Sequence, residues 1–142
     1  MNPPGGRGTQ TGDIWERTIV PALKANYPDR HARRMKVGEQ LFGGVYIADF
    51  VLDGIIISAK WQQVAGTTEQ KLLYDIASLI DIIRHSNTKF RKGYVVLGGT
   101  GFRATTREFL LAQRHRQYLR DGELVEVVSL DDFIGRVNRR AL

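Results

Sequence analysis

One dipeptide between two strongly β-forming segments constrains this chain more than any other feature of its sequence. Val45–Leu52 and Ile55–Gln62 are both rich in β-branched and aromatic residues, and only Asp53 and Gly54 separate them. Asp-Gly is a favoured pair for a two-residue type I′ turn, which needs positive φ at both positions. The sequence therefore predicts an antiparallel hairpin over residues 45–62.

The turn also determines which side chains of the hairpin face each other. The residues that flank the turn are paired, and the same register places Asp49 opposite Ser58. Directly opposed side chains project from one face, with Cβ atoms about 4.5–5.5 Å apart. Period-two alternation adds Lys60 and Gln62 to that face. One side of an apolar hairpin is thus expected to carry a carboxylate, a hydroxyl, an amine and an amide.

Two interpretations of this polar face remain open at the level of sequence. Ile47, Val51 and Ile56 share the face, so it is expected to be partly buried, where charges are costly unless they pair or bind something. Asp49 and Lys60 could form a structural salt bridge. Alternatively, a carboxylate beside an amine suits metal-assisted phosphodiester hydrolysis, because the carboxylate binds a hard cation and the amine stabilises developing charge.

Periodicity and turn residues predict the remaining elements. Residues 1–12 are rich in Gly and Pro and are expected to form a flexible tail before a single domain over 13–142. Pro21 is expected to kink the first helix. The predicted order is α-β-β-β-α-β-α-β-α: a helix between Asp13 and Asn26, a strand over 35–42, the hairpin, a helix over 69–85, a strand over 92–97, a helix over 105–120, a strand over 124–128, and a final helix capped by Ser129.

Charge and composition narrow the classes of partner. The 142 residues include 21 Lys and Arg against 15 Asp and Glu, a formal charge of +6, which favours a polyanion such as nucleic acid and equally fits a merely soluble basic protein. No segment has the length of a membrane span or the pattern of a secretory signal. Cysteine is absent, which excludes thiolate chemistry and fits a reducing cytoplasm.

Three short motifs in order resemble the PD-(D/E)XK nuclease superfamily. Asp49 ends "VYIAD", and "IIISAKWQ" follows after the turn with Lys60 in it. The next segment, "EQKLLYD", places Gln70 and Tyr74 in the Q-x-x-x-Y spacing of RecB-like nucleases. The resemblance covers roughly residues 13–97. It implies an α/β fold with a restriction-endonuclease-like core, a mixed sheet with an antiparallel hairpin flanked by helices, αβββαβ plus a C-terminal αβα.

The resemblance also implies roles for individual residues. Asp49 would bind Mg²⁺, for which Mn²⁺ can substitute, and Lys60 would activate water. Glu16 occupies the position of a first-helix glutamate that completes the metal site in many members, and the main-chain carbonyl of Ala59 is a further implied ligand. The residues expected to position the site or the phosphate are Gln62, Gln70 and Tyr74.

Ser58 departs from the pattern of this superfamily. It stands two residues before Lys60, where the superfamily carries a second acidic residue, and a hydroxyl is a much poorer Mg²⁺ ligand than a carboxylate. The missing charge could come from Glu16 or Glu69, or the Ala59 carbonyl could contribute. In the third interpretation the site is weakened or inactive.

The expected partner is DNA and the expected activity is that of a Mg²⁺-dependent endonuclease. It would be a small restriction-like or Holliday-junction-resolvase-like enzyme in the cytoplasm of a prokaryotic or phage-infected cell, and a homodimer is one expected form. The alternative is a catalytically weakened nuclease fold that binds DNA without cutting it. Gly98–Gly101 imitates a dinucleotide-binding turn, but too little chain follows it, so no dinucleotide cofactor is expected. The cations expected to contact the DNA backbone are Arg33, Arg34, Arg103 and Arg107.

Overall fold

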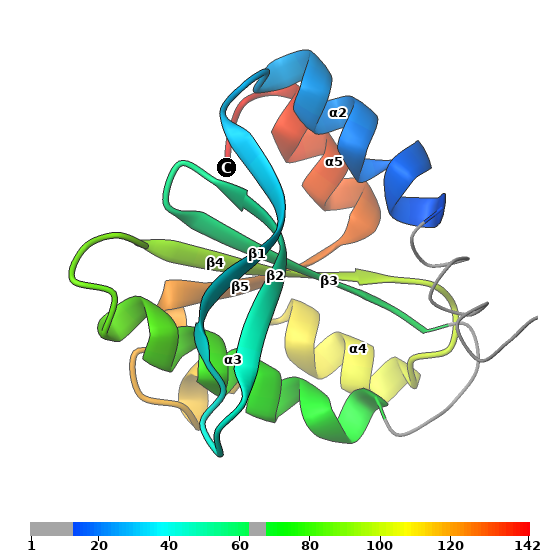
Figure 1. The fold of residues 1–142 in the computed structure, drawn as a ribbon. Coiled ribbons are helices and arrows are strands. Elements are labelled where there is room, and N and C mark those ends of the chain that lie inside the picture. Colours follow the sequence, from blue (N-terminus) through cyan, green and yellow to red (C-terminus); the bar gives the residue numbers. More distant parts are fainter. Residues whose placement is uncertain (1–12, 63–67) are drawn as a thin grey trace, which may run out of the picture.

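A mixed β-sheet with helices on both faces makes up the described part of the chain (Figure 1). The computed structural model describes residues 13–62 and 68–142. Its elements are α2 (Ile19–Asn26), β1 (His31–Glu39), β2 (Val45–Leu52), β3 (Ile55–Trp61), α3 (Thr68–Arg84), β4 (Lys92–Gly98), α4 (Ala104–Leu111), the 3₁₀ turns η1 (Arg114–Gln117) and η2 (Gly122–Leu124), β5 (Val125–Ser129) and α5 (Leu130–Asn138).

The five strands of this sheet lie in their chain order, β1-β2-β3-β4-β5. β1, β2 and β3 pair antiparallel, whereas β3, β4 and β5 pair parallel. The parallel pairs require crossover connections, which α3 and α4 supply. The fold is therefore the mixed α/β arrangement that the sequence predicts, and the order of its elements is confirmed.

Two apolar clusters pack against the two faces of the sheet. One joins α2 and α5 to the sheet around Leu23, Phe50 and Phe133, and the other joins α3 and α4 to it around Ile56, Ile76 and Leu110. In Figure 1 these helix pairs lie on opposite sides of the strands. β3 and β4 are buried on both faces, so residues that alternate along them serve both clusters.

The central hairpin has the predicted turn, and the predicted register holds for the three pairs next to it, but Asp49 and Ser58, which were expected to face each other, are not paired. Asp53 and Gly54 have φ values of 47° and 85°, as a type I′ turn requires. Leu52 pairs with Ile55, and the next two pairs along the strands follow the same register. Local turn chemistry was therefore sufficient to align these two strands.

The first helix ends at Asn26 and is interrupted at Thr18, as the predicted kink from Pro21 implies, because Pro21 has no N–H to continue the hydrogen bonding. Two other predicted boundaries are wrong. β1 covers 31–39 instead of 35–42, since its basic residues lie on an edge strand that shows little apolar alternation. The helix predicted over 105–120 ends at Leu111, and Gln113 follows with a φ of 61°.

None of the described helices combines the length and apolar character that crossing a bilayer demands.

Candidate active site

Asp49 lies where β2 and β3 separate. Their paired residues end at Phe50 and Ile57, one step short of Asp49. Instead of a main-chain pair, the Asp49 carboxylate oxygen Oδ2 accepts a hydrogen bond of 2.7 Å from the N–H of Ala59. No hydrogen bond joins its other oxygen, Oδ1, to a residue within 13–62 or 68–142. One carboxylate oxygen is thus anchored to β3 and the other remains available to a ligand.

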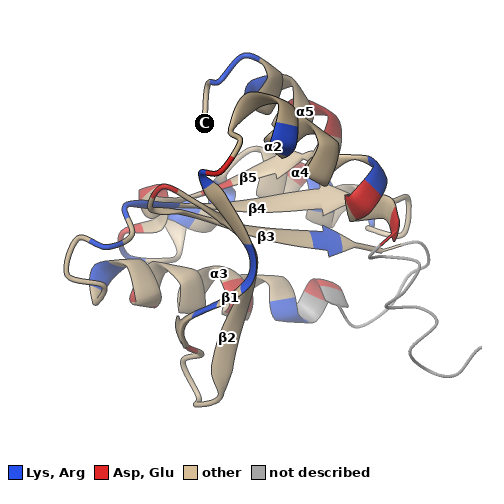
Figure 2. Cartoon of the chain, turned by 45° about the horizontal axis from the view of Figure 1, so that its top comes forward, with Lys and Arg blue, Asp and Glu red and all other residues tan. Residues whose placement is uncertain are grey.

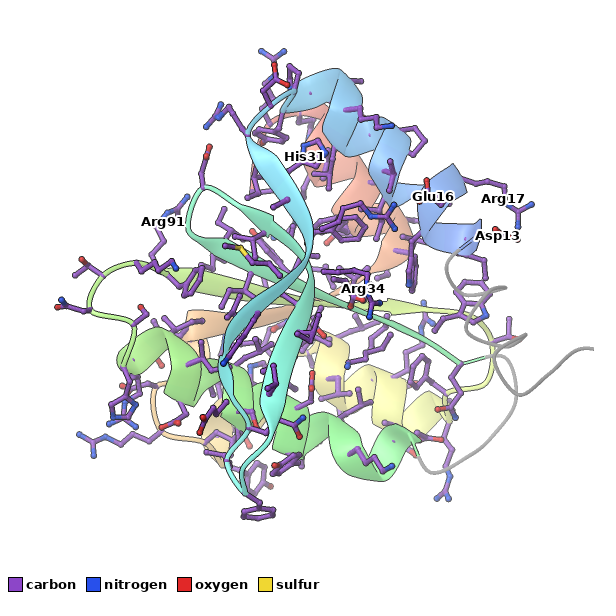
Figure 3. All side chains as sticks on the ribbon, in the orientation of Figure 1. Asp13, Glu16, Arg17, His31, Arg34 and Arg91 are labelled. Carbon is purple, nitrogen blue, oxygen red and sulfur yellow. The ribbon has the colours of Figure 1, made fainter. Side chains whose placement is uncertain are left out.

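The edge strand β1 is distorted beside Asp49. Arg33 pairs with Phe50 and Met35 pairs with Ala48, so Arg34 lies across from Asp49. Arg34 has a φ of 50°, a left-handed conformation that is unfavourable for a residue with a Cβ. Its side chain lies close to the point where the β1–β2 ribbon crosses the sheet (Figure 3). Strain of this kind concentrates at functional sites.

A second carboxylate reaches the site from helix α3. Asp75 Oδ2 lies 2.8 Å from the Tyr46 hydroxyl, which donates to it, and 3.5 Å from Ser58 Oγ. The same oxygen forms an ion pair of 3.4 Å with Lys60 Nζ. Tyr46 and Ser58 are buried and lie 3.2 Å apart through their oxygens. Ser58 therefore stands beside a carboxylate instead of being one, and the ion pair of Lys60 is with Asp75 and not with Asp49.

The electrostatics of these groups follow from burial. Burial raises the pKa of Asp49 above its ordinary value, and the negative charge of Asp75 adds to that increase. The Ala59 N–H, Lys60 and Arg34 oppose it by stabilising the ionised form. Burial, and then Asp75, raise the pKa of Tyr46, so its hydroxyl stays protonated and remains a donor.

A cavity of about 200 Å³ gives access to Lys60 and Asp75. Its other lining residues are Gln40, Lys71, Leu72 and Tyr74. The Lys60 side chain is 26% exposed and the Asp75 side chain 19% exposed, so neither charge is sealed under the core. A ligand can therefore reach the polar cluster from solvent.

The donor set fits a divalent cation of the Mg²⁺ type. Mg²⁺ in proteins is usually held by one or two carboxylates, with water and substrate phosphate completing its octahedron. Asp49 and Asp75 provide two carboxylates whose mutual repulsion a cation would relieve. Within the described ranges no cluster of three or more His, Asp and Glu side chains is set to hold a metal. The protein would thus supply a minority of the ligands.

Glu16 is engaged by a basic residue of β1. It forms an ion pair with Arg33, whose guanidinium also lies over the ring of Phe50 at 5.5 Å. Glu16 makes no hydrogen bond or ion pair to Asp49 or Asp75, all three being described residues. Its role as a metal ligand stays a prediction, as does that of the Ala59 carbonyl. Glu69, the other predicted source of charge, pairs with Arg103.

The remaining predicted residues are distributed between the site and the loop after β4. Gln62 is buried and donates its side-chain amide to the carbonyl of Gly101 at 3.1 Å, so it holds the glycine-rich loop. Tyr74 lines the cavity and its hydroxyl accepts from the N–H of Phe42. Arg103 and Arg107 lie at the start of α4. The side chain of Gln70 falls outside what the structure describes.

Asp75 and Tyr46 are the site residues that sequence reasoning missed. A signal for Asp75 was present: it lies three residues after Leu72 and four before Leu79, both of which are buried in α3. A carboxylate on the buried stripe of a helix needs a partner or a ligand. Tyr46 carried no comparable signal, because a tyrosine in a strand is ordinary core.

Comparison with known proteins supports one assignment. The sequence of residues 7–141 matches the profile of the PD-(D/E)XK nuclease superfamily domain. No curated protein and no solved structure gives a significant match. The match covers nearly the whole chain and agrees with the mixed sheet flanked by helices. The chain therefore belongs to the PD-(D/E)XK nuclease superfamily.

Proposed function

We propose that this chain is a Mg²⁺-dependent DNA endonuclease, in which Mn²⁺ can replace Mg²⁺. The observation that carries the proposal is the Lys60–Asp75 ion pair at an accessible cavity, with Asp49 on the neighbouring strand close enough for both charges to act on its carboxyl. Helix α3, through the carboxylate of Asp75, supplies the negative charge that Ser58 lacks. This arrangement favours an active site over a fold that only binds DNA.

Each residue has a distinct task in the proposed hydrolysis. Asp49 and Asp75 would hold the divalent ion, which supplies Lewis-acid stabilisation of phosphate charge and lowers the pKa of a bound water. Lys60 directs an ammonium group at the cavity, where it neutralises charge that develops on the phosphate. Tyr46 donates to Asp75 and fixes the orientation of that carboxylate. The net reaction adds water across one P–O bond and leaves a phosphate and a hydroxyl end.

DNA contacts are proposed for cations beside this cluster. Lys71 lines the cavity and is exposed, and Arg34 lies across from Asp49 on β1. Figure 2 shows further basic residues along β1. Arg33, which is engaged by Glu16, and Arg103 and Arg107 at the start of α4 are more distant candidates for the backbone. Contacts of this kind position DNA without reading its sequence.

Cleavage of supercoiled plasmid tests the proposal. Wild-type protein with Mg²⁺ or Mn²⁺ should nick or linearise the plasmid, and chelation should stop it. Asp49→Ala, Lys60→Ala and Asp75→Asn should each lower the rate by about 100-fold or more. Asp131→Asn and Lys24→Ala are matched controls, because both residues are exposed on helices of the other face.

The outcomes separate the two candidate functions. Salt-sensitive binding without cutting by wild type in either metal would support the alternative, a nuclease fold that binds DNA only. In that case Ser58→Glu is informative, because gained activity would show that the native site holds too little negative charge. If Asp75→Asn cuts like wild type, the α3 carboxylate is not part of the site.

A further inference from the structure

The turn between β1 and β2 exposes an aromatic ring to solvent. Phe42 is 89% exposed, the most exposed large apolar side chain among the described residues. Gly43 and Gly44 follow with φ values of 96° and 97°, and Gln40 and Gly44 close the turn through a hydrogen bond of 2.9 Å. The β1–β2 turn projects away from the rest of the sheet (Figure 1), and Phe42 within it is exposed.

This ring packs on Tyr74, a residue that lines the cavity of the candidate active site. The Phe42 N–H donates to the Tyr74 hydroxyl at 3.1 Å, and the two rings lie 4.8 Å apart at 34°. Tyr74 and Gln40 line the same cavity as Lys60 and Asp75. An aromatic surface with one open side therefore continues directly into a pocket that carries two lysines and a carboxylate.

We propose that the Phe42–Tyr74 pair is a stacking platform for an unpaired nucleobase within a few nucleotides of the scissile phosphate. This inference rests on the proposed nuclease function and adds a substrate class to it: DNA with unpaired bases, as in single strands, flaps and branch points. Exposed aromatic rings beside cationic grooves bind the faces of bases that are not stacked in a duplex. Duplex bases could reach the ring only after an unfavourable loss of stacking.

A second copy of the chain is the other occupant that such a surface could bind. The formal charge of +6 disfavours it, because two like-charged molecules repel each other, whereas the same charge attracts a polyanion. The lysines of the adjoining cavity, Lys60 and Lys71, match the phosphates that flank an unpaired base. Charge and continuity with the pocket therefore both favour nucleic acid.

Binding without cleavage tests the platform independently of catalysis. A fluorescein-labelled single strand is titrated with protein in EDTA, once intact and once with abasic sites placed at successive positions. For wild type, one or two abasic positions should weaken binding roughly 5- to 100-fold. Phe42→Ala should bind the intact strand more weakly by the same factor, and abasic sites should not weaken its binding further. Phe42→Trp should bind the intact strand as tightly as wild type and remain sensitive to abasic sites.

Leu41→Ala is the matched control, because Leu41 is an exposed apolar residue of the same turn. It should leave the sensitivity to abasic sites unchanged. The proposal is overturned if Phe42→Ala weakens intact and abasic strands equally, or if wild type is dimeric by sedimentation and Phe42→Ala makes it monomeric. Plasmid cleavage is scored separately, so a protein that stacks bases but does not cut would contradict the proposed function and leave the platform in place.

Discussion

At the scale of single residues, the candidate site opposes the stability of the fold. The folded chain keeps Asp49 in a half-buried position where desolvation raises the pKa of its carboxyl above the ordinary 3.8. Between those two pKa values the folded state holds a proton that the unfolded chain has lost, so stability falls as the pH rises through this range. At neutral pH the ionised Asp49 is therefore a destabilising group in the absence of a cation.

Asp49→Asn should accordingly be more stable than wild type at pH 7. Its amide oxygen can still accept from the N–H of Ala59, and the buried charge is gone. We expect the free energy of unfolding to rise on the order of 1 kcal/mol at pH 7, and this gain to shrink towards pH 4. Urea unfolding at both pH values measures it, with Asp131→Asn as the exposed control. Mg²⁺ should stabilise wild type and not Asp49→Asn. Equal stability of the two proteins at both pH values would contradict this assignment.

Arg34 offers a second test at the same scale. A left-handed residue with a Cβ costs roughly 1–2 kcal/mol, which Arg34→Gly should partly recover, while DNA affinity falls because a cation beside Asp49 is lost. Arg140→Gly is the matched control, since Arg140 is an exposed arginine with a φ of 52° near the C-terminus. Both variants should gain stability by urea unfolding, but only Arg34→Gly should weaken binding by anisotropy. Unchanged affinity in Arg34→Gly would show that the distortion is purely structural.

At the scale of elements, the sequence correctly predicted the features that depend on residues close together in the chain. The Asp53–Gly54 turn set the register of β2 and β3, and Ser129 caps α5 by accepting from the N–H of Asp132. The prediction of a helix over 105–120 is wrong because the segment after Leu111 makes hydrogen bonds to the distant strand β5. Gln113 pairs through its side chain with both main-chain groups of Val127. Helical periodicity carries no information about such a contact.

The Gln113 contact should be important for stability. Gln113→Ala would leave the N–H and carbonyl of Val127 without these partners, and we expect a loss of about 1–3 kcal/mol. Gln117→Ala, at an exposed position in η1, should change the free energy of unfolding by less than about 0.5 kcal/mol. Urea denaturation compares the two variants. A loss of equal size in both would mean that the segment responds to any truncation.

At the scale of the whole molecule, some residues of the candidate site could be predicted from the sequence and others could not. Asp49 and Lys60 were placed on neighbouring strands by a turn only a few residues away. Asp75 joins them because α3 packs across the sheet, a long-range arrangement that depends on the whole core. The superfamily resemblance supplied the roles of the first two residues, but only the packed structure showed that Asp75 stands beside Ser58.

The charge of the whole chain leads to a prediction about salt. If Arg34, Lys60 and Lys71 neutralise three phosphates, the logarithm of the DNA association constant should fall with a slope of about −2.7 against the logarithm of salt concentration. Affinity would then decrease roughly 40-fold between 50 and 200 mM KCl. Lys71→Ala should reduce the slope by about one, whereas Lys24→Ala on the opposite face should not change it. A slope near zero would exclude backbone contacts as the source of binding.

The β1–β2 ribbon bears the Phe42 ring at its turn and Asp49 four residues beyond Val45, the first residue of β2. At about 3.3 Å per residue, the strand from Val45 to Asp49 spans roughly 13 Å, so the turn and the carboxylate are held at a fixed separation. A ribbon of fixed length sets the distance between the base that is bound at its turn and the phosphate that is cut. An enzyme built in this way would choose its cut by counting nucleotides from a structural defect, and the offset would be the same whatever bases lie between.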